Sequence, residues 1–296
     1  MKKAVKIKFS KIDLFDFRLG GPGLGNLLFP WARGVIFARK NNIPVLSPNW
    51  KTFKIGTYLR SEKDKRTYND LFVKNGKSGF SKYYNELFLK KFNETDQNFS
   101  SSKSGILEFR GMKNQMQNIL EDYKIVKEEL IKIVNPKWLA IAEKNKPENI
   151  AVHIRLGDFQ ASNEEELRKG KTNTQIPIKW YISTIQKIND QLGTDHQIYL
   201  FSDGKKEQLK EILAIENVKL IEGGNAISDM LSLSYAKVLI ASNSTFSLWA
   251  SYLGRCNTIW FPGTLKVKLF EESGDAVEFE LDYENQFSTE HSKILN

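Results

Sequence analysis

Residues 150–159 read Ile-Ala-Val-His-Ile-Arg-Leu-Gly-Asp-Phe. Apolar and β-branched side chains fill the first half of this stretch, and a turn signal at Pro147 precedes it. Gly157 lies near its end, where charged residues replace the apolar ones. The pattern predicts a short buried strand that ends in a tight loop.

Three chemically capable side chains lie at the end of this strand: His153, Arg155 and Asp158. An ionised arginine there is costly unless an anion or a carboxylate meets it, so Arg155 needs a partner. One candidate is Asp158, which would make the pair a structural clamp. The other is a phosphate group, whose geometry suits the planar donor fork of arginine. This stretch alone does not decide between the two.

The chain after residue 149 alternates regularly between strand and helix patterns. After an opening strand within 150–159, the expected strands are 197–202, 218–222, 238–243 and 258–261, and the expected helices are 178–192, 205–215, 228–237 and 245–253. This alternation predicts a parallel sheet that helices cover on both faces. Ligands in such sheets bind at the carboxyl ends of the strands.

Polar side chains gather at these strand ends. Ser202 and Asp203 follow one expected strand, and Asn243, Ser244 and Thr245 follow another. Ser244 or Thr245 can cap the following helix, whose first backbone N–H groups and dipole then form a ready anion site. The alternative is that both residues are caps and nothing more. Together with Arg155, these residues favour an anion site.

The first half opens with an expected strand at 3–9 and a glycine-rich loop at 18–26, before a helix that begins just after the loop. Gly23, Gly25 and Asn26 belong to this loop. Its glycines permit backbone angles closed to other residues and let a ligand approach the main chain. A glycine loop is a weak signal, because an ordinary tight turn explains it as well.

The rest of the first half is less regular. We expect a strand at 43–47, loops with short helices around 83–92, a strand at 107–109 and a helix at 114–134 that Asn135-Pro136 ends. The predicted domains are residues 1–147 and 148–265. A C-terminal tail, 266–296, is expected to pack back on the first domain.

Composition narrows the class of protein. The chain has 296 residues, 41% of them hydrophobic and 27% charged, as in ordinary globular proteins of about two domains. Cys256 is the single cysteine, so no internal disulfide can form. No window approaches the roughly 20 apolar residues of a membrane span, and the first ten residues do not resemble a signal peptide. We expect a cytoplasmic protein.

The net charge of +9 indicates an anionic partner: nucleic acid, an acidic membrane face or phosphorylated small molecules. The lysines are spread along the whole chain, and no nucleic-acid recognition motif accompanies them. We therefore expect no nucleic-acid partner. A peripheral contact with acidic lipid on the inner face of the membrane agrees better with this charge.

Five ordered motifs resemble those of the α-1,2-fucosyltransferases of glycosyltransferase family 11, over about residues 18–261. They are Arg18–Trp31, His153–Asp158, Tyr199–Asp203, Ile227–Met230 and Asn243–Trp249. The second motif, His-x-Arg-x-Gly-Asp, and the last, Asn-Ser-Thr-Phe-Ser-x-Trp, are specific in combination. The glycine loop and the Ser-Asp pair are weak by themselves.

The resemblance implies an α/β fold of the GT-B type, with two Rossmann-like domains facing a cleft. It implies GDP-fucose as the donor, no metal and no other cofactor, and inversion from the β-linked donor to an α-fucoside. The implied acceptor is a galactose-containing oligosaccharide or a lipid-linked glycan. A transferase of another GDP-sugar or linkage, and a non-catalytic nucleotide-binding module, are the alternatives.

The resemblance implies roles for individual residues. Arg155 would bind the donor pyrophosphate together with Ser244 and Thr245, and Asp203 would bind the guanine edge. Asp158 and His153 are the candidates for the general base. The remaining donor-site candidates are Ser202, Asn243, Phe246, Gly23, Gly25 and Asn26. This chain departs from the usual family pattern in having Leu156 for an arginine, Gly204 for a second aspartate, and a longer glycine loop that contains Pro22.

Overall fold

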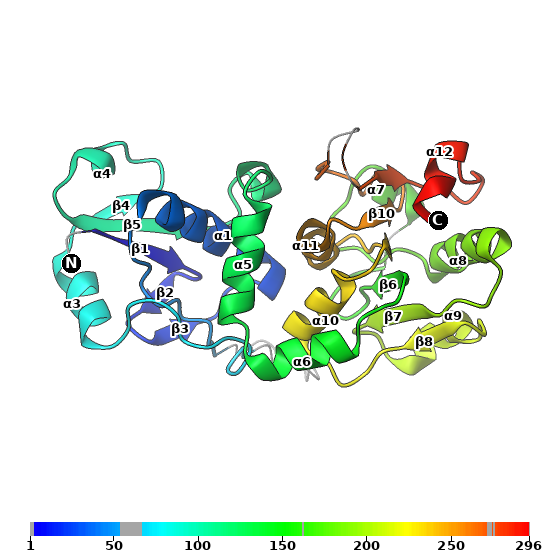
Figure 1. The fold of residues 1–296 in the computed structure, drawn as a ribbon, viewed down its shortest axis with the longest axis horizontal. Helices are drawn as coiled ribbons and strands as arrows, with labels where there is room; N and C mark the ends of the chain where they lie inside the picture. Colours follow the sequence, from blue (N-terminus) through cyan, green and yellow to red (C-terminus); the bar gives the residue numbers. More distant parts are fainter. Residues whose placement is uncertain (1–2, 54–66, 162, 271–273, 275, 296) are drawn as a thin grey trace. The chain divides into compact units, whose positions relative to one another are not determined.

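The computed structural model describes residues 3–53, 67–161, 163–270, 274 and 276–295 (Figure 1). The chain divides into two compact units, Met1–Pro136 and Lys137–Asn296. Each unit has a parallel β-sheet with helices packed on it. Part of the expected loop region, residues 54–66, lies outside the described residues.

The first unit contains a three-stranded parallel sheet of order β1-β5-β4, formed by Lys3–Lys8, Gly105–Arg110 and Lys91–Asn93. The expected strand at 43–47 is reduced to single bridges at Val45 and Leu46. Helix α1 (Leu24–Asn41) packs closely on β1 through Gly34, where an added Cβ would lie 2.9 Å from Ile7. Apolar side chains of β1, α1 and β5 form the core here.

Three smaller features of this unit were not predicted or were predicted differently. Strands β2 (Ile12–Leu14) and β3 (Phe17–Leu19) form an antiparallel hairpin. Helix α3 (Phe80–Phe88) begins three residues before the expected one. The other short elements of the unit are α4 (Asn98–Ser101) and a 3-10 turn, η1 (Gln115–Asn118).

The expected helix 114–134 is interrupted. Asn114 and Gln115 have positive φ angles of 50° and 40°, which an α-helix does not accommodate, and α5 starts only at Tyr123 and runs to Ile133. The helix ends before Asn135-Pro136, as expected, and Pro136 also opens the next helix, α6 (Pro136–Lys144). Proline suits a first helical position because its missing N–H has no intrahelical partner there.

The second unit contains a six-stranded sheet of order β11-β10-β9-β6-β7-β8. Every pairing in it is parallel. The strands are β6 (Ile150–Ile154), β7 (Ile198–Ser202), β8 (Val218–Leu220), β9 (Val238–Ile240), β10 (Asn257–Trp260) and β11 (Glu278–Glu280). The helices are α7 (Glu164–Arg168), α8 (Ile178–Leu192), α9 (Lys210–Leu213) after the 3-10 turn η2 (Lys206–Leu209), α10 (Ala226–Leu233), α11 (Thr245–Gly254) and α12 (Thr289–Ser292) with η3 (Lys293–Leu295). The predicted alternation of strands and helices is confirmed.

The boundary and the tail differ from the expectation. Helix α6 belongs to the second unit, where the Ser232 hydroxyl donates to the Ala142 carbonyl at 3.2 Å, so the division falls at Pro136 rather than at residue 147. The C-terminal residues belong to the second unit. Strand β11 pairs with β10, Trp180 Nε1 donates to the Leu281 carbonyl at 2.8 Å, and Phe279 lies in the core of the second unit.

Candidate functional site

The strand order of the second unit places the candidate site. Counted along the chain from β6, the order is 3-2-1-4-5-6, and the crossover direction reverses between β6 and β9. Ligands of such sheets bind in the crevice at the carboxyl ends of the strands where this reversal occurs. Residues 155–158 follow β6 at that point, and residues 241–246 follow β9. Figure 1 shows α11 beside the sheet of the second unit.

Arg155 bonds to two carboxylates at this edge. Its Nη2 contacts Asp158 Oδ1, and its Nη1 lies 2.5 Å from Asp203 Oδ2. The guanidinium also lies over the Phe159 ring, 5.4 Å from the ring centre. Asp158, the partner that the sequence suggested for a structural clamp, therefore does pair with Arg155, and Asp203 is a second partner. A guanidinium has five N–H donors, so these contacts leave donors for a ligand, and the side chain is 23% exposed.

Asp203 holds both the loop after β6 and the arginine. Its Oδ1 accepts hydrogen bonds from the backbone N–H groups of Leu156, at 2.8 Å, and Gly157, at 3.2 Å. A Cβ added to Gly157 would lie 2.2 Å from Asp203 Oδ2, so this contact requires glycine. With Oδ2 on Arg155, both carboxylate oxygens are engaged within the protein.

His153 lies at the centre of a buried network of serines. Its Nδ1 is 2.7 Å from Ser247 Oγ and 2.9 Å from Ser242 Oγ. Ser242 Oγ in turn lies 2.8 Å from Ser244 Oγ. The imidazole packs on the Phe246 ring with centroids 4.8 Å apart. The network therefore joins the end of β6 to the first turn of α11.

The pKa of His153 argues against a role for this residue as the general base. Burial, which disfavours the charged imidazolium, lowers the pKa of His153 to about 3; the Asp203 carboxylate raises this pKa and the Arg155 guanidinium lowers it further. The ring is thus neutral near pH 7, and its tautomer decides whether Nδ1 donates or accepts the hydrogen bonds to the two serine hydroxyls. A general base works best with a pKa near the operating pH. We assign His153 to positioning rather than proton transfer.

The N-terminus of α11 is capped in the manner the sequence predicts. Ser244 is the N-cap residue, and its hydroxyl accepts from the Ser247 N–H at 3.3 Å. Thr245 is the first helical residue, and the first N–H groups of a helix have no intrahelical partner. This end of α11 can therefore receive an anion, as the helix dipole favours.

Two other predicted residues serve the loops. Asn243 Nδ2 donates to the Lys171 carbonyl at 2.7 Å and lies 3.3 Å from Thr174 Oγ1, which ties the segment between α7 and α8 to the loop after β9. Ser202 Oγ accepts from the Gly204 N–H at 3.0 Å. These contacts are the kind that shape a binding loop rather than face a ligand.

Two of the three departures from the family pattern, Leu156 and Gly204, are neighbours in space. Leu156 is 4% exposed, and a Cβ added to Gly204 would lie 2.4 Å from Leu156 Cδ1. The Leu156 side chain therefore fills the space that a side chain at position 204 would occupy. Any larger residue at 204 would require Leu156 to move.

The glycine-loop residues belong to the first unit. Gly20 and Gly21 have positive φ angles of 69° and 109°, as the sequence suggested for this loop. Gly23 instead has an ordinary φ of −66° as the N-cap residue of α1, and an added Cβ would meet open space. Gly25 and Asn26 lie in the first turn of α1, and the buried Asn26 Oδ1 has no hydrogen-bond partner among the described residues.

Asp229 is a site candidate to which sequence reasoning gave no role, although it lies in one of the quoted motifs. It is in the first turn of α10, after the Asn225 cap, at the same edge of the sheet as the other loops. Burial raises the pKa of Asp229 to about 7, and a hydrogen bond from Ser228 opposes the shift. A carboxyl that titrates near neutrality at a strand edge was not visible from the sequence, because burial sets this pKa.

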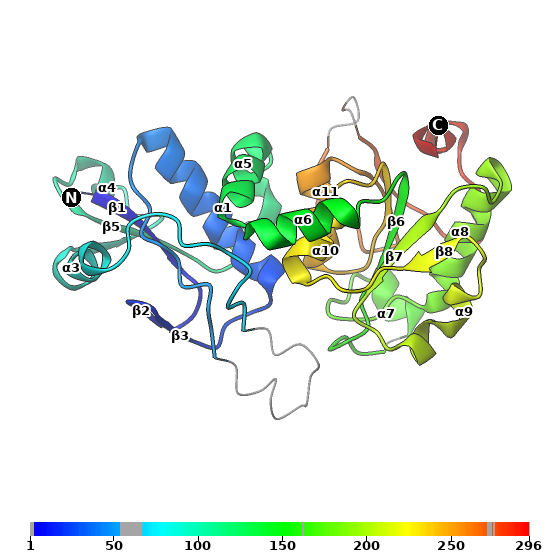
Figure 2. The same ribbon diagram turned by 60° about the horizontal axis from the view of Figure 1, so that its bottom comes forward.

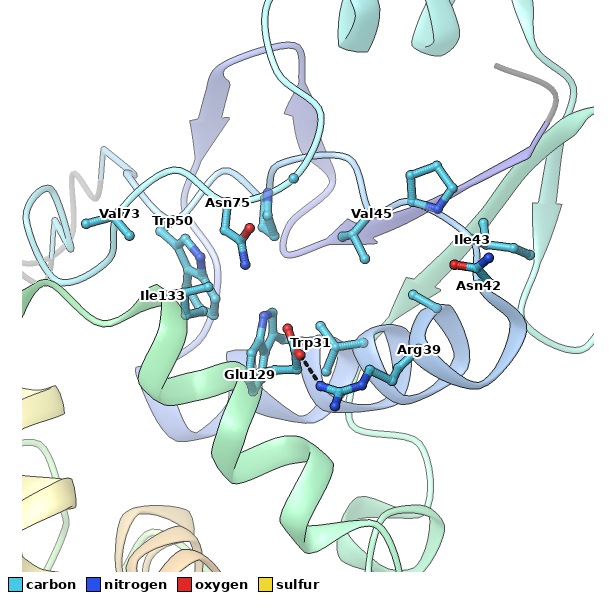
Figure 3. Close-up of a pocket in the computed structure, with 15 residues that line it drawn as sticks. Trp31, Arg39, Asn42, Ile43, Val45, Trp50, Val73, Asn75, Glu129 and Ile133 are labelled. Carbon is cyan, nitrogen blue, oxygen red and sulfur yellow. Dashed lines mark hydrogen bonds and ion pairs between the residues drawn. The ribbon is translucent and has the colours of Figure 1, made fainter.

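A pocket of about 400 Å³ lies in the first unit (Figure 3). Trp31 and Trp50 contribute apolar faces, and the Arg39–Glu129 ion pair, 2.5 Å between Nη1 and Oε1, contributes charge. None of the residues predicted for the donor site lines it. Its mixture of aromatic and polar groups can hold a polar ring with one apolar face.

Among the residues that the structure describes, no group of three or more His, Cys, Asp or Glu side chains could hold a metal ion. The described helices also include none long and apolar enough to cross a membrane.

The sequence model of glycosyl transferase family 11 matches residues 45–276 of this chain. That match spans strands β6 to β10 of the second unit, the loops at their ends and the Arg155 site. The chain belongs to glycosyl transferase family 11. This family 11 protein is also 26% identical over 263 residues to an alpha-1,2-colitosyltransferase of Escherichia coli, with 80% of this chain and 86% of the relative covered. It is therefore a glycosyltransferase.

Solved structures support the fold. The NodZ fucosyltransferase from Bradyrhizobium superposes with a TM-score of 0.51 at 13% identity, and NodZ alpha-1,6-fucosyltransferase soaked with GDP-fucose with a TM-score of 0.50 at 12% identity. Each likeness covers 88% of this chain and 94% of the other. With the parallel sheets of both units, they confirm the predicted α/β fold of the GT-B type.

Proposed function

We propose that this family 11 glycosyltransferase moves L-fucose from GDP-fucose to a hydroxyl of a galactose-containing acceptor. The observation that carries the proposal is the position of Arg155 and the N-terminus of α11, which flank the point where the sheet reverses its crossovers. A fork of N–H donors and a helix N-terminus together suit a pyrophosphate. The alternative of a non-catalytic nucleotide-binding module fits the family less well.

We assign the residues of this site different roles. Arg155 binds the pyrophosphate, with Ser244 and Thr245 presenting the first N–H groups of α11. Asp203 positions Arg155 and the loop at Gly157, since its oxygens are already engaged there. This replaces the role at the guanine edge expected for Asp203 from the resemblance.

Asp158 is the residue that donor binding would release. It lies in an exposed loop and is itself 39% exposed, whereas Asp203 is held by two backbone N–H groups. A pyrophosphate arriving at Arg155 competes with Asp158 for the same guanidinium. The displaced carboxylate can then act as general base for the acceptor.

The chemical step is a single displacement with inversion. The acceptor oxygen forms a bond to the anomeric carbon while the bond from that carbon to the phosphate oxygen breaks, and the hydroxyl proton passes to Asp158. GDP leaves with the electron pair. Arg155 and the α11 N–H groups stabilise the charge on the leaving phosphate, an effect typically worth about 10² to 10³ in rate per donor. The step as written needs no metal ion.

The donor sugar has a second candidate. The Escherichia coli relative is named for the transfer of colitose in an alpha-1,2 linkage, and this chain covers 86% of its length. GDP-linked colitose is therefore the competing donor. An alpha-1,2 linkage supports O2 of the galactoside as the acceptor hydroxyl, on an oligosaccharide or a lipid-linked glycan of the cell surface.

Incubation with GDP-fucose or GDP-linked colitose and a panel of galactosides tests the proposal, with GDP release and product mass followed. We expect one donor to give a galactoside product of the corresponding mass. GDP binding without product on any acceptor would favour a nucleotide-binding module.

The same assay in EDTA should retain its transfer rate. Loss of transfer that Mg²⁺ or Mn²⁺ restores would contradict a metal-independent step.

A further inference from the structure

Helix α3 turns its polar side chains inward. Lys82, Asn85 and Glu86 are each 2% exposed. Glu86 Oε1 lies 3.0 Å from the buried Lys6 Nζ, and Lys82 Nζ lies 3.1 Å from Asp16 Oδ1. The inner face of this helix is thus fixed by ion pairs, which reverses the usual pattern of a helix on a globular protein.

The outer face of α3 is apolar. Phe80, Tyr84, Leu87 and Phe88 recur at helical spacing and are 83%, 51%, 62% and 69% exposed. Leaving such side chains in water is unfavourable, and large exposed apolar surfaces mark interaction sites.

The β2–β3 hairpin repeats this inversion. Asp13 and Arg18, directly paired across the strands, are 3% and 2% exposed. The alternate positions point outward: Ile12, Leu14 and Phe17 are 52%, 41% and 58% exposed. Period-2 alternation with the polar residues inside presents an apolar sheet face to solvent.

The hairpin and α3 are adjacent, as both views of the ribbon show (Figures 1 and 2). Phe15 in the hairpin turn packs edge-on against Tyr83 with ring centroids 5.2 Å apart, and its N–H donates to Glu86 Oε2 at 2.6 Å. Each of the two elements turns its apolar face away from these buried polar contacts. We define the apolar patch as the outer face of α3, formed by Phe80, Tyr84, Leu87 and Phe88; Ile12, Leu14 and Phe17 are exposed on the neighbouring hairpin.

Basic residues flank the apolar patch. Among the described residues of 8–20 and 74–93, the exposed charges are those of Lys11, Lys74, Lys77, Lys90, Lys91 and Asp16. Asp16, the single acid among them, already pairs with Lys82 and Lys74. An aromatic and aliphatic face with a lysine border is the arrangement of helices that lie in the interface of an acidic membrane.

We propose that the apolar patch docks this protein on the surface of an acidic lipid bilayer, with α3 in the interfacial plane. The surrounding lysines would contact lipid phosphates, and the Phe and Tyr rings would enter the boundary between headgroups and acyl chains. A second copy of the chain fits this surface less well, because a symmetric contact would bring the same lysines against one another. This inference does not depend on which sugar the enzyme transfers.

Flotation of the full chain with lipid vesicles tests the proposal. Wild type should float with vesicles that contain phosphatidylglycerol and much less with pure phosphatidylcholine. The Leu87→Glu/Phe88→Glu variant should lose at least about tenfold in partition, because two charges then replace the inserted side chains. Phe80→Glu, at the most exposed position, serves as a second variant that does not disturb the interior.

Matched control variants distinguish the effect of the apolar patch on lipid binding from the effect of a change in net charge. Met112→Glu and Val73→Glu add acids at other exposed apolar positions, 43% and 39% exposed, and should leave binding nearly unchanged. Lys90→Gln/Lys91→Gln should weaken binding to acidic vesicles more than Lys124→Gln/Lys210→Gln, which removes two exposed lysines elsewhere.

Any one of three results would overturn the proposal. The first is that wild type does not bind acidic vesicles, and the second is that the patch variants bind them as well as wild type does. The third is a wild-type dimer in sedimentation that Leu87→Glu/Phe88→Glu dissociates, which would mean that a second copy of the chain covers the patch. Transfer to a water-soluble acceptor should persist in the patch variants, so loss of lipid binding is distinguishable from failure of the proposed function.

Discussion

The Arg155 guanidinium and the Asp203 carboxylate are joined across neighbouring strand ends, with Nη1 2.5 Å from Oδ2. The other oxygen of Asp203 holds the backbone N–H groups of Leu156 and Gly157. One carboxylate therefore fixes both the arginine and the loop that carries Asp158. This arrangement explains why the two acids beside Arg155 should respond differently to mutation.

Asp203→Asn should weaken GDP binding, since the loop and Arg155 lose their common anchor. Asp158→Asn should bind GDP as well as wild type or more tightly, because a competitor for the guanidinium is removed. Its transfer rate should nevertheless fall by about 10² to 10⁴, the usual contribution of a general base. Calorimetry with GDP and single-turnover transfer measure these effects. A normal transfer rate in Asp158→Asn would remove it as the base.

The buried imidazole of His153 should make the protein less stable in acid. Its folded pKa of about 3 lies below the unfolded value of 6.5, so only the unfolded chain takes up this proton between those values. Stability should fall as pH drops below 6.5, by at most about 1.4 kcal/mol per pH unit from this group. Thermal melts from pH 7.5 to 5 should show a shallower slope in His153→Asn. An equal slope would mean that the imidazole is not held neutral.

Asp229 should act with the opposite sign. Its folded pKa of about 7 lies above the ordinary value of 3.8, so the folded state retains the proton longer, and stability should decline as pH rises from about 4 through 7. Asp229→Asn removes the cost of burying the charge and should raise the melting temperature at pH 8 but not at pH 4. The effect is reduced because the residue is partly exposed to solvent. Equal changes at both pH values would contradict this account.

Two glycines of the first unit offer a matched pair of substitutions. Gly21→Val should destabilise the protein, because φ is 109° and an added Cβ would lie 2.9 Å from Arg18 Nη1. Gly23→Val should fold normally, since its Cβ meets open space. If the loop approaches donor sugar or acceptor, Gly23→Val should lower turnover with little change in GDP affinity. Loss of GDP binding instead would place the nucleotide against the first unit.

Much of the second unit could be predicted from its sequence, because buried parallel strands and amphipathic helices leave strong periodic signals. The motif at 150–159 predicted the buried strand, the loop that follows it and Arg155 as a site residue. The contacts of Asp203 with Leu156 and Gly157 could not be read, since they join positions 46 and 47 residues apart. Nor could the burial that shifts the pKa of His153 and Asp229.

The differences in the first unit and near the end of the chain have physical causes. The inverted burial of α3, with its ion pairs inside and its aromatic rings exposed, cannot be read from the spacing of apolar residues alone. Pro136 was expected only to stop the helix before it, although proline also begins helices. Strand β11 was missed because three residues carry too short a pattern, and its place depends on pairing with β10.

The measurement that tests the account most directly is calorimetry of GDP binding to folded Arg155→Lys and Arg155→Ala. We expect both variants to lose GDP affinity by similar factors, because a point charge cannot replace the fork on a pyrophosphate. Ser244→Ala/Thr245→Ala should weaken GDP by roughly 1 to 3 kcal/mol in the same assay. If Arg155 only clamps Asp158 and Asp203, both arginine variants will melt at lower temperature while the folded protein binds GDP normally. Unchanged GDP affinity in Arg155→Ala would contradict the donor site proposed here.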